Sequence, residues 1–234
     1  MTAATDTLAD RMIQIGAGLP GPFGYFFYKK LHARFEPAAN ADFEAALAGL
    51  GPDDICLDLG ANIGTFTARM AASGATVHAF EPDRAAFDAL SKNLKAHANV
   101  VLHNAAIGAE DGTAILNHPK RYDQEPLRKS VGSSLVRKDR RWIDAQFSEE
   151  VRVIGLFDYL DKLPRPAAII KMDIEGAEWP ILDAIRAGRG LDRFDALYVE
   201  THERFDTWRL MPQLRRMQAF AASLDRPRIN LHWQ

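Results

Sequence analysis

Two short segments of this chain carry residues that could hold a nucleoside. The first is Asp58-Leu-Gly-Ala-Asn-Ile-Gly64, in which two glycines bracket a turn between an apolar run and a helix-forming run. Glycine has no Cβ, so such a turn brings backbone N–H groups and a helix N-terminus close to a ligand. The second is Phe80-Glu81-Pro82, where the carboxylate of Glu81 follows another apolar run and can accept two hydrogen bonds from ribose hydroxyls. Together they predict a pocket for an adenosine cofactor.

The spacing within the turn separates two cofactors that use such a pocket. A dinucleotide fingerprint, G-x-G-x-x-G, would need glycines at positions 60, 62 and 65, but the chain has Gly60, Asn62 and Thr65. Asp58 would repel phosphates and attract a cationic ammonium, such as that of a methionyl group. The spacing Asp-x-Gly-x-Asn-x-Gly instead resembles motif I of class I S-adenosylmethionine (SAM) methyltransferases, and this resemblance implies SAM rather than NAD. The residues expected to contact it here are Asp58, Gly60, Ala61, Asn62, Gly64, Thr65, Phe66, Glu81 and Pro82.

Acidic or amide side chains follow each of the apolar runs typical of parallel strands. The residues at those ends are Asp58, Glu81, Asn104, Asp173 and Glu200. In open α/β sheets, ligands bind beyond the carboxyl ends of the strands, so these side chains should converge on one crevice. The small residues that follow the amide, Ala105 and Ala106, would leave room beside Asn104 for an adenine ring.

The same strand ends offer groups for methyl transfer to a hydroxyl. Such a transfer needs the acceptor oxygen, methyl carbon and sulfur in line, and the hydroxyl must lose its proton. We expect Asp173 to stand beside the methyl group and to contact the cofactor, and Glu200 with His202 to take the proton. A Mg²⁺ ion is the alternative to a base, because oxygen ligands at adjacent strand ends suit it and a bound cation lowers the pKa of a hydroxyl. Its ligands would be Asp173 and Glu200, with Glu175 or His202 as the third.

The elements that position these residues alternate from residue 53 onward. This alternation predicts an α/β fold with a mostly parallel sheet and helices on both faces. Main strands are expected at 54–59, 75–80, 100–103, 168–172, 196–200 and 228–233, with further β character at 113–116 and 151–154. Helices are expected to start at 65 and to span 83–97, 156–163, 179–187 and 211–224.

Two regions depart from the alternation. Residues 1–52 would form an N-terminal helical arm or lid, with helices at 8–18 and 41–50 separated by a breaker cluster and an aromatic run at 19–28. The aromatic run either packs on the core or lines the acceptor pocket, and a homodimer is one arrangement that it allows.

Residues 109–150 would form an insertion near the acceptor site. The segment 131–134, Val-Gly-Ser-Ser, could supply hydroxyls to either ligand. The basic side chains of the insertion are either solvated or placed to bind an anionic group of the acceptor. They are Arg121, Arg128, Lys129, Arg137, Lys138, Arg140 and Arg141.

Composition narrows the class of protein further. The chain has 234 residues, a formal net charge of −2 and 26% charged residues, so no basic field recruits nucleic acid. The single cysteine, Cys56, lies in the first expected strand and leaves no disulfide framework. No apolar run reaches the roughly 20 residues that cross a bilayer, and the first residues lack the basic and apolar regions of a signal peptide. We expect a soluble, cytoplasmic protein.

Four segments in this order resemble the FkbM family of SAM-dependent methyltransferases. They are Asp58-Leu-Gly-Ala-Asn-Ile-Gly64, Phe80-Glu81-Pro82, Asn104-Ala-Ala-Ile-Gly108 and Lys171-Met-Asp-Ile-Glu-Gly-Ala-Glu178. The resemblance spans roughly residues 53–203 and implies a class I methyltransferase domain with a Rossmann-like fold over residues 53–234. It also implies O-methylation of a hydroxyl on a small molecule or on a sugar of a polysaccharide, glycolipid or glycosylated natural product. One departure is the tail, where a single closing strand predicts six main strands.

Two other functions stay open at this point. One is methyl transfer to nitrogen, or to a protein or an RNA; the near-neutral charge and the lack of an Asn-Pro-Pro-Tyr motif after the fourth strand count against it. The other is a module that binds SAM or another adenosine ligand without turnover. The acceptor-side groups Asp173, Glu200 and His202 count against that function.

Overall fold

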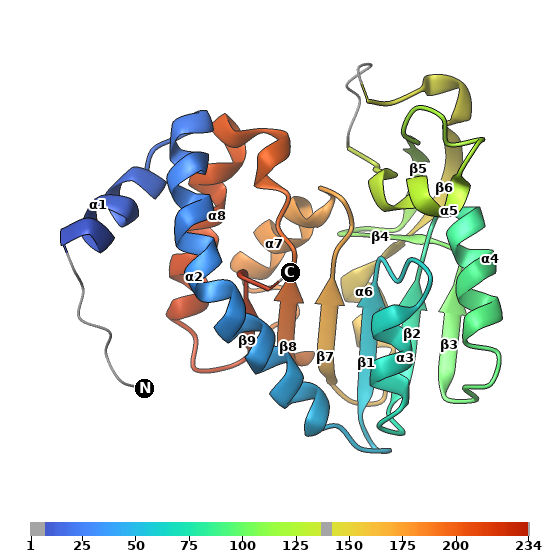
Figure 1. The fold of residues 1–234 in the computed structure, drawn as a ribbon. Coiled ribbons are helices and arrows are strands. Elements are labelled where there is room, and N and C mark those ends of the chain that lie inside the picture. Colours follow the sequence, from blue (N-terminus) through green and yellow to red (C-terminus); the bar gives the residue numbers. More distant parts are fainter. Residues whose placement is uncertain (1–7, 137–141, 234) are drawn as a thin grey trace.

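The computed structural model describes residues 8–136 and 142–233, and its centre is a six-stranded sheet (Figure 1). The strand order is β3-β2-β1-β7-β8-β9, and every neighbouring pair is parallel. The strands are β1 (Ile55–Leu59), β2 (Thr76–Phe80), β3 (Val100–His103), β7 (Ala167–Met172), β8 (Phe194–Val199) and β9 (Arg228–Asn230). The expected α/β class and the six main strands are confirmed. The central strand β1 is buried along its whole length, as a strand covered on both faces must be.

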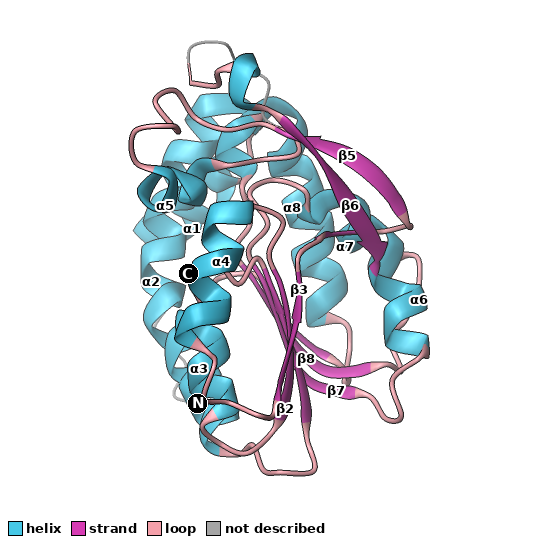
Figure 2. Cartoon of the chain, turned by 90° about the vertical axis from the view of Figure 1, so that its right-hand side faces the viewer, coloured by secondary structure: helices cyan, strands magenta, loops and turns pink. Residues whose placement is uncertain are grey.

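Helices cover both faces of this sheet (Figure 2). On one face lie α3 (Thr65–Ala71) and α4 (Arg84–Asn93), and on the other lie α6 (Leu156–Asp161), α7 (Glu178–Arg186) and α8 (Thr207–Ala222). The apolar sides of α6, α7 and α8 share one core cluster with β1, β7 and β8. None of the helices in the described residues is long and apolar enough to cross a membrane.

The N-terminal region differs from its prediction. After α1 (Leu8–Ala17), a single helix α2 (Gly21–Ala48) replaces the expected breaker cluster at 19–28 and the separate helix at 41–50. The prolines do not break it because Pro20 is the extended N-cap and the next proline lies in the first turn, where no helical N–H is needed. Pro37 lies inside the helix, and the chain stays helical through it.

The helix α2 packs on the sheet at two places. Tyr28 is buried in the core cluster of α7 and α8, whereas Phe43 belongs to the cluster of α3 and meets the ring of Tyr198 edge to face at 4.9 Å. Other aromatic residues of the same run, such as Phe23 and Phe26, are more than half exposed. The aromatic run therefore contributes Tyr28 to the core and leaves part of its surface uncovered.

A second, three-stranded sheet lies beyond the carboxyl ends of β1 to β3 (Figure 1). It consists of β4 (Ala106–Gly108), β6 (Glu149–Gly155) and β5 (Gly112–Leu116), with β6 in the middle. Between β5 and β6 the chain forms the short helix α5 (Pro126–Lys129) and the 3₁₀ turns Ser130–Gly132 and Ala145–Phe147; a further 3₁₀ turn, Glu203–Phe205, follows β8. The basic residues Arg137, Lys138, Arg140 and Arg141 lie outside the described residues.

Candidate functional site

A cavity of about 720 Å³, part of it open to solvent, lies where β1, β2 and β7 end. It is covered there by the chain between β5 and β6, described for residues 117–136 and 142–148 and called the β5–β6 segment below. Several residues expected to bind the cofactor line it, namely Gly60, Asn62, Glu81, Pro82, Ala105, Ala106 and Asp173. Glu175, expected as a metal ligand, lines it as well. Of the five strand-end side chains expected to converge, Glu81 and Asp173 therefore line this cavity.

Other expected site residues lie behind the lining of the cavity. These are Asp58, Ala61, Gly64, Thr65, Phe66, Asn104, Glu200 and His202. The amide of Asn104 donates to the carbonyl oxygens of Glu81 and Pro82, at 2.9 and 3.1 Å, and so holds that loop in place. None of the aromatic residues at 19–28 lines this cavity either.

Gly60 allows the ends of β1 and β7 to touch. Its φ is 80°, in the left-handed region that glycine adopts readily. A Cβ at this position would lie 1.9 Å from the carbonyl oxygen of Asp173, which no packing can accommodate. The turn continues through Asn62, whose φ is 48°, and asparagine is one of the few other residues that tolerate this region.

We expect Gly60→Ala to lower the free energy of unfolding by at least about 1–2 kcal/mol, the cost of the left-handed conformation alone, and to weaken SAM binding about tenfold. The clash with the Asp173 carbonyl adds to this cost because both groups belong to the backbone. Urea denaturation and calorimetric titration with SAM would measure the two effects. Gly112→Ala is the matched control, since a Cβ added at Gly112 would meet no atom within 4 Å. Equal effects of the two substitutions would contradict the role of the Gly60 contact.

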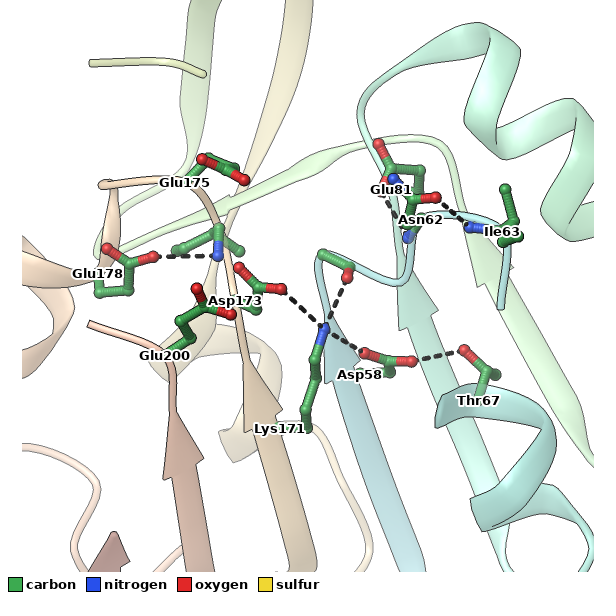
Figure 3. A network of polar contacts seen from close by, with 12 residues as sticks. Asp58, Asn62, Ile63, Thr67, Glu81, Lys171, Asp173, Glu175, Glu178 and Glu200 are labelled. Carbon is green, nitrogen blue, oxygen red and sulfur yellow. Dashed lines mark hydrogen bonds and ion pairs between the residues drawn. The ribbon is translucent and has the colours of Figure 1, made fainter. Parts of the chain in front are cut away.

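Glu81 is a buried carboxylate at the edge of the cavity (Figure 3). One oxygen accepts a hydrogen bond from the backbone N–H of Asn62 at 2.8 Å, and the other accepts from Asp83 N–H at 2.9 Å. Burial raises the pKa of Glu81 to about 7, although these two hydrogen bonds act in the opposite direction. Because each carboxylate oxygen has two lone pairs, the group keeps acceptor capacity for ribose hydroxyls.

A buried ion pair supports the glycine turn from below, and the sequence analysis assigns no role to its lysine. The ammonium of Lys171 lies 3.3 Å from Asp58 Oδ1 and donates to the carbonyl of Gly60 at 2.8 Å (Figure 3). The other Asp58 oxygen accepts from the Thr67 hydroxyl at 2.6 Å. Asp58 was expected to attract the ammonium of the cofactor, but its charge is paired with Lys171 and it does not line the cavity.

Lys171 stays charged in this environment. Burial lowers its pKa, but the charges of Asp58 and Asp173 outweigh burial, so the pKa is raised. The rings of Phe66 and Trp233 lie 5.6 and 5.9 Å from the ammonium and add a favourable cation–π contribution. A lysine within the apolar run 167–172 was the available sequence signal, because β1 and β7 place it directly beside Asp58.

On the other side of the cavity, His202 is fully buried among carboxylates. Its Nδ1 lies 2.9 Å from Glu178 Oε1. Its Nε2 lies 3.5 Å from Glu175, 3.7 Å from Asp173 and 3.8 Å from Glu200, and among the described residues this nitrogen has no hydrogen-bond partner. The acids expected at the ends of β7 and β8 therefore meet around one imidazole.

The charges in this cluster determine which group can accept a proton. Burial lowers the pKa of His202, but the hydrogen bond to Glu178 and the nearby carboxylates outweigh it and raise the pKa to about 9. Burial also raises the pKa of Glu175, to about 7, and that of Glu200. In this arrangement neutral pH favours the protonated, cationic form of His202. The role of base expected of it stays a prediction.

The β5–β6 segment forms the remaining side of the cavity and is fastened to the first βα loops. The carboxylate of Asp83, which caps α4, accepts from the Tyr122 hydroxyl at 2.8 Å and from Ser133 Oγ at 3.2 Å. The amide of Asn62 donates to Ser130 Oγ at 3.2 Å. Val131 and Ser133, from the segment expected to supply hydroxyls, line the cavity. The cavity residues that the sequence did not indicate as site residues are Phe80, Ile107, Leu116, Ser130, Leu135 and Ile174.

The family model for the methyltransferase FkbM domain matches residues 58–223. This chain belongs to the FkbM methyltransferase family. The match begins at Asp58 and contains the glycine turn, the β5–β6 segment and the carboxylate cluster, whereas α1 and α2 precede it. All four segments on which the resemblance rests thus lie inside the FkbM domain.

Comparison with solved structures gives two further likenesses. One is to a precorrin-6y C5,15-methyltransferase from Geobacter metallireducens, with 14% identity, a TM-score of 0.40, and coverage of 76% of this chain and 69% of that one. The other is to a putative RNA methyltransferase from Pyrococcus horikoshii, with 16% identity, a TM-score of 0.39, and coverage of 80% and 67%. No curated protein matches this FkbM chain.

Proposed function

We propose that this FkbM methyltransferase transfers the methyl group of SAM to a hydroxyl group, favouring a hydroxyl on a sugar of a polysaccharide, glycolipid or glycosylated natural product. The observation that carries the proposal is one cavity with two acidic sides. Glu81 lines it at the end of β2, and Asp173 with Glu175 lines it after β7. The first side suits a nucleoside and the second suits a reacting hydroxyl.

The cofactor would lie across the ends of β1, β2 and β4. Its ribose would bind Glu81, and its adenine would rest on the small and apolar side chains of Ala105, Ala106 and Ile107. The cationic sulfonium would then be held near Asp173, because carboxylates attract it in a site with little water. Asp58 and Lys171 would contribute from behind by holding the turn at Gly60.

The acceptor hydroxyl would meet Asp173 and Glu175, which reach the cavity, whereas Glu200 and His202 would act from behind them. Carboxylates in this position can accept the hydrogen bond and then the proton of a hydroxyl.

Charge in the cavity favours a neutral acceptor over an anionic one. The described residues that line it include the carboxylates of Glu81, Asp173 and Glu175 and no lysine or arginine. A phosphate-rich acceptor such as RNA would be repelled there, whereas a sugar hydroxyl would not. The choice of a sugar rests on family analogy, with Ser130 and Ser133 as hydroxyl partners on the cavity side. A cytoplasmic location and a homodimer stay predictions.

Calorimetric titration with SAM and separately with NAD tests the proposal first. We expect SAM to bind and NAD to give no heat. Incubation with methyl-labelled SAM and a panel of neutral saccharides should then yield labelled product and S-adenosylhomocysteine. Binding of NAD alone would reject the methyl-transfer function, and SAM binding without transfer to any hydroxyl, amine, protein or RNA tested would support a binding module instead.

We expect SAM affinity to rise about tenfold between pH 6 and pH 8, because the ionised fraction of a carboxyl with a pKa near 7 rises from roughly one tenth to nine tenths. Burial raises the pKa of Glu81 to about 7, and only its ionised form accepts hydrogen bonds with both oxygens. Glu81→Gln should bind SAM more weakly and lose this pH dependence. Glu150→Gln, which makes the same change at an exposed position, should keep the native SAM affinity and its pH dependence. An unchanged pH dependence of SAM affinity in Glu81→Gln would show that the ribose does not bind this carboxylate.

A further inference from the structure

We infer that Asp173, Glu175 and His202 form a binding site for a divalent transition-metal ion beside the cavity. One ligand atom from each residue lies within 4.8 Å of the other two. The carboxylates come from the turn after β7 and the imidazole from the segment after β8, so the site bridges two neighbouring strand ends. Two of the three residues also line the cavity.

Acidic groups gather at many protein surfaces, but here a buried imidazole is directed at them. His202 is fully buried, and within the described part of the chain its Nε2 has no hydrogen-bond partner. Leaving a buried nitrogen unpaired is costly, which suggests that another group completes it. The distances fit an ion: two ligands bound at about 2.1 Å can be at most about 4.2 Å apart. Nε2 lies 3.5 Å from Glu175 and 3.7 Å from Asp173.

A carboxylate behind the imidazole fixes its orientation. Glu178, fully buried, lies 2.9 Å from His202 Nδ1, so a proton on Nδ1 leaves the lone pair of Nε2 facing the other carboxylates. The same oxygen of Glu178 accepts hydrogen bonds from the backbone N–H groups of Ile174 and Gly176, at 3.1 and 3.2 Å. Glu178 thereby holds both the histidine and the turn that carries Glu175. Metal-binding histidines commonly have such a carboxylate partner.

The donor set indicates the kind of ion. The ligands expected for Mg²⁺ were Asp173 and Glu200, with Glu175 or His202 as the third. The three residues whose ligand atoms converge are Asp173, Glu175 and His202, so the set contains an imidazole nitrogen and omits Glu200. Mg²⁺ prefers oxygen ligands, whereas an imidazole with carboxylates suits divalent transition ions. The ion would take the position of the proton on Nε2. A bound ion would lower the pKa of the acceptor hydroxyl, and this role rests on the proposed function. The inference that an ion binds here does not rest on it.

Mn²⁺ is the probe that tests this site, because free and bound Mn²⁺ differ in their paramagnetic resonance spectra. We expect the full chain, freed of metal with a chelator, to bind one Mn²⁺ and to keep it in a tenfold excess of Mg²⁺. Pulsed measurements should show coupling of the bound ion to one imidazole nitrogen. His202→Ala should abolish this coupling, Glu175→Gln should weaken binding at least tenfold, and Glu178→Gln should weaken it about 10–100-fold.

Glu149→Gln is the matched control, because Glu149 also lies beside the Nε2 of a buried histidine, 3.2 Å from that of His118, but outside the cluster. It should bind Mn²⁺ as the native chain does. Mn²⁺ that stays free, that is displaced equally by Mg²⁺, or that binds His202→Ala and Glu175→Gln unchanged would overturn the inference. The metal-free chain is titrated with SAM in parallel. If it binds SAM but no Mn²⁺, the metal site is rejected and the proposed function is kept. If it binds no SAM, the proposed function is rejected.

Discussion

Asp173→Asn is expected to lower the rate of methyl transfer by about 10²–10⁴-fold while changing SAM affinity by less than about threefold. The carboxylate of Asp173 lines the cavity after β7. In the proposed reaction it would serve both the cofactor side and the acceptor side. The carboxylate would attract the sulfonium and orient the acceptor hydroxyl. Asparagine has nearly the same shape, but it cannot take the proton of the hydroxyl and it attracts a cation more weakly. The proposed ribose contact at Glu81 would be unaffected, so most of the binding should remain.

Single-turnover transfer of labelled methyl groups, together with SAM calorimetry, would separate rate from affinity. Asp195→Asn is the matched control, because it makes the same change on the neighbouring strand β8, near that strand's opposite, amino-terminal end. This control should have native rate and affinity. A parallel loss of affinity and rate in Asp173→Asn would show instead that this carboxylate holds the cofactor, which is the other role expected of it.

Lys171→Met should lower the free energy of unfolding by about 3–5 kcal/mol, the usual cost of removing one partner of a buried ion pair. Lys171 is buried, and its ammonium compensates the fully buried carboxylate of Asp58 at 3.3 Å. It also donates to the carbonyl of Gly60, so its loss releases the turn that would hold the cofactor. SAM affinity should therefore fall together with stability.

Urea denaturation of the variant and of Lys95→Met, a control at an exposed lysine, measures this effect. In the double variant Lys171→Met with Asp58→Asn, the stranded negative charge is absent, and part of the lost stability should return. Should Lys171→Met be no less stable than Lys95→Met, the pair would contribute nothing to the fold. Should the double variant show strictly additive losses, the two residues would not interact.

The sheet could be predicted because its strands are short apolar runs that end in polar residues. Burial on both faces removes polar residues from such strands, so their limits can be read from the sequence. The strand β4 was missed, since its three residues become a strand only by pairing with β6, for example Ala106 with Val153. The start of α2 was misread because proline in a first helical turn has the same sequence signature as a chain break.

In the site, residues next to a strand end could be predicted and contacts between distant segments could not. The position of Glu81 follows from its strand, and the structure places it at the cavity. The pairing of Lys171 with the Gly60 carbonyl joins residues 111 positions apart, and no local pattern reports it. The same limit applies to Ser130, which meets Asn62 across 68 positions, and to the four acids around His202.

The contact between Gly60 and the carbonyl of Asp173 has a mechanical consequence. Because backbone meets backbone there, the loop that would seat the nucleoside and the loop that would carry the reacting carboxylate are expected to move together. Side-chain rotation cannot change their separation. If donor and acceptor bind as proposed, the distance between them would thus be set when the chain folds, before either substrate arrives, and in-line transfer depends steeply on that distance. Any adjustment to acceptors of different size must come from the β5–β6 segment on the opposite side of the cavity.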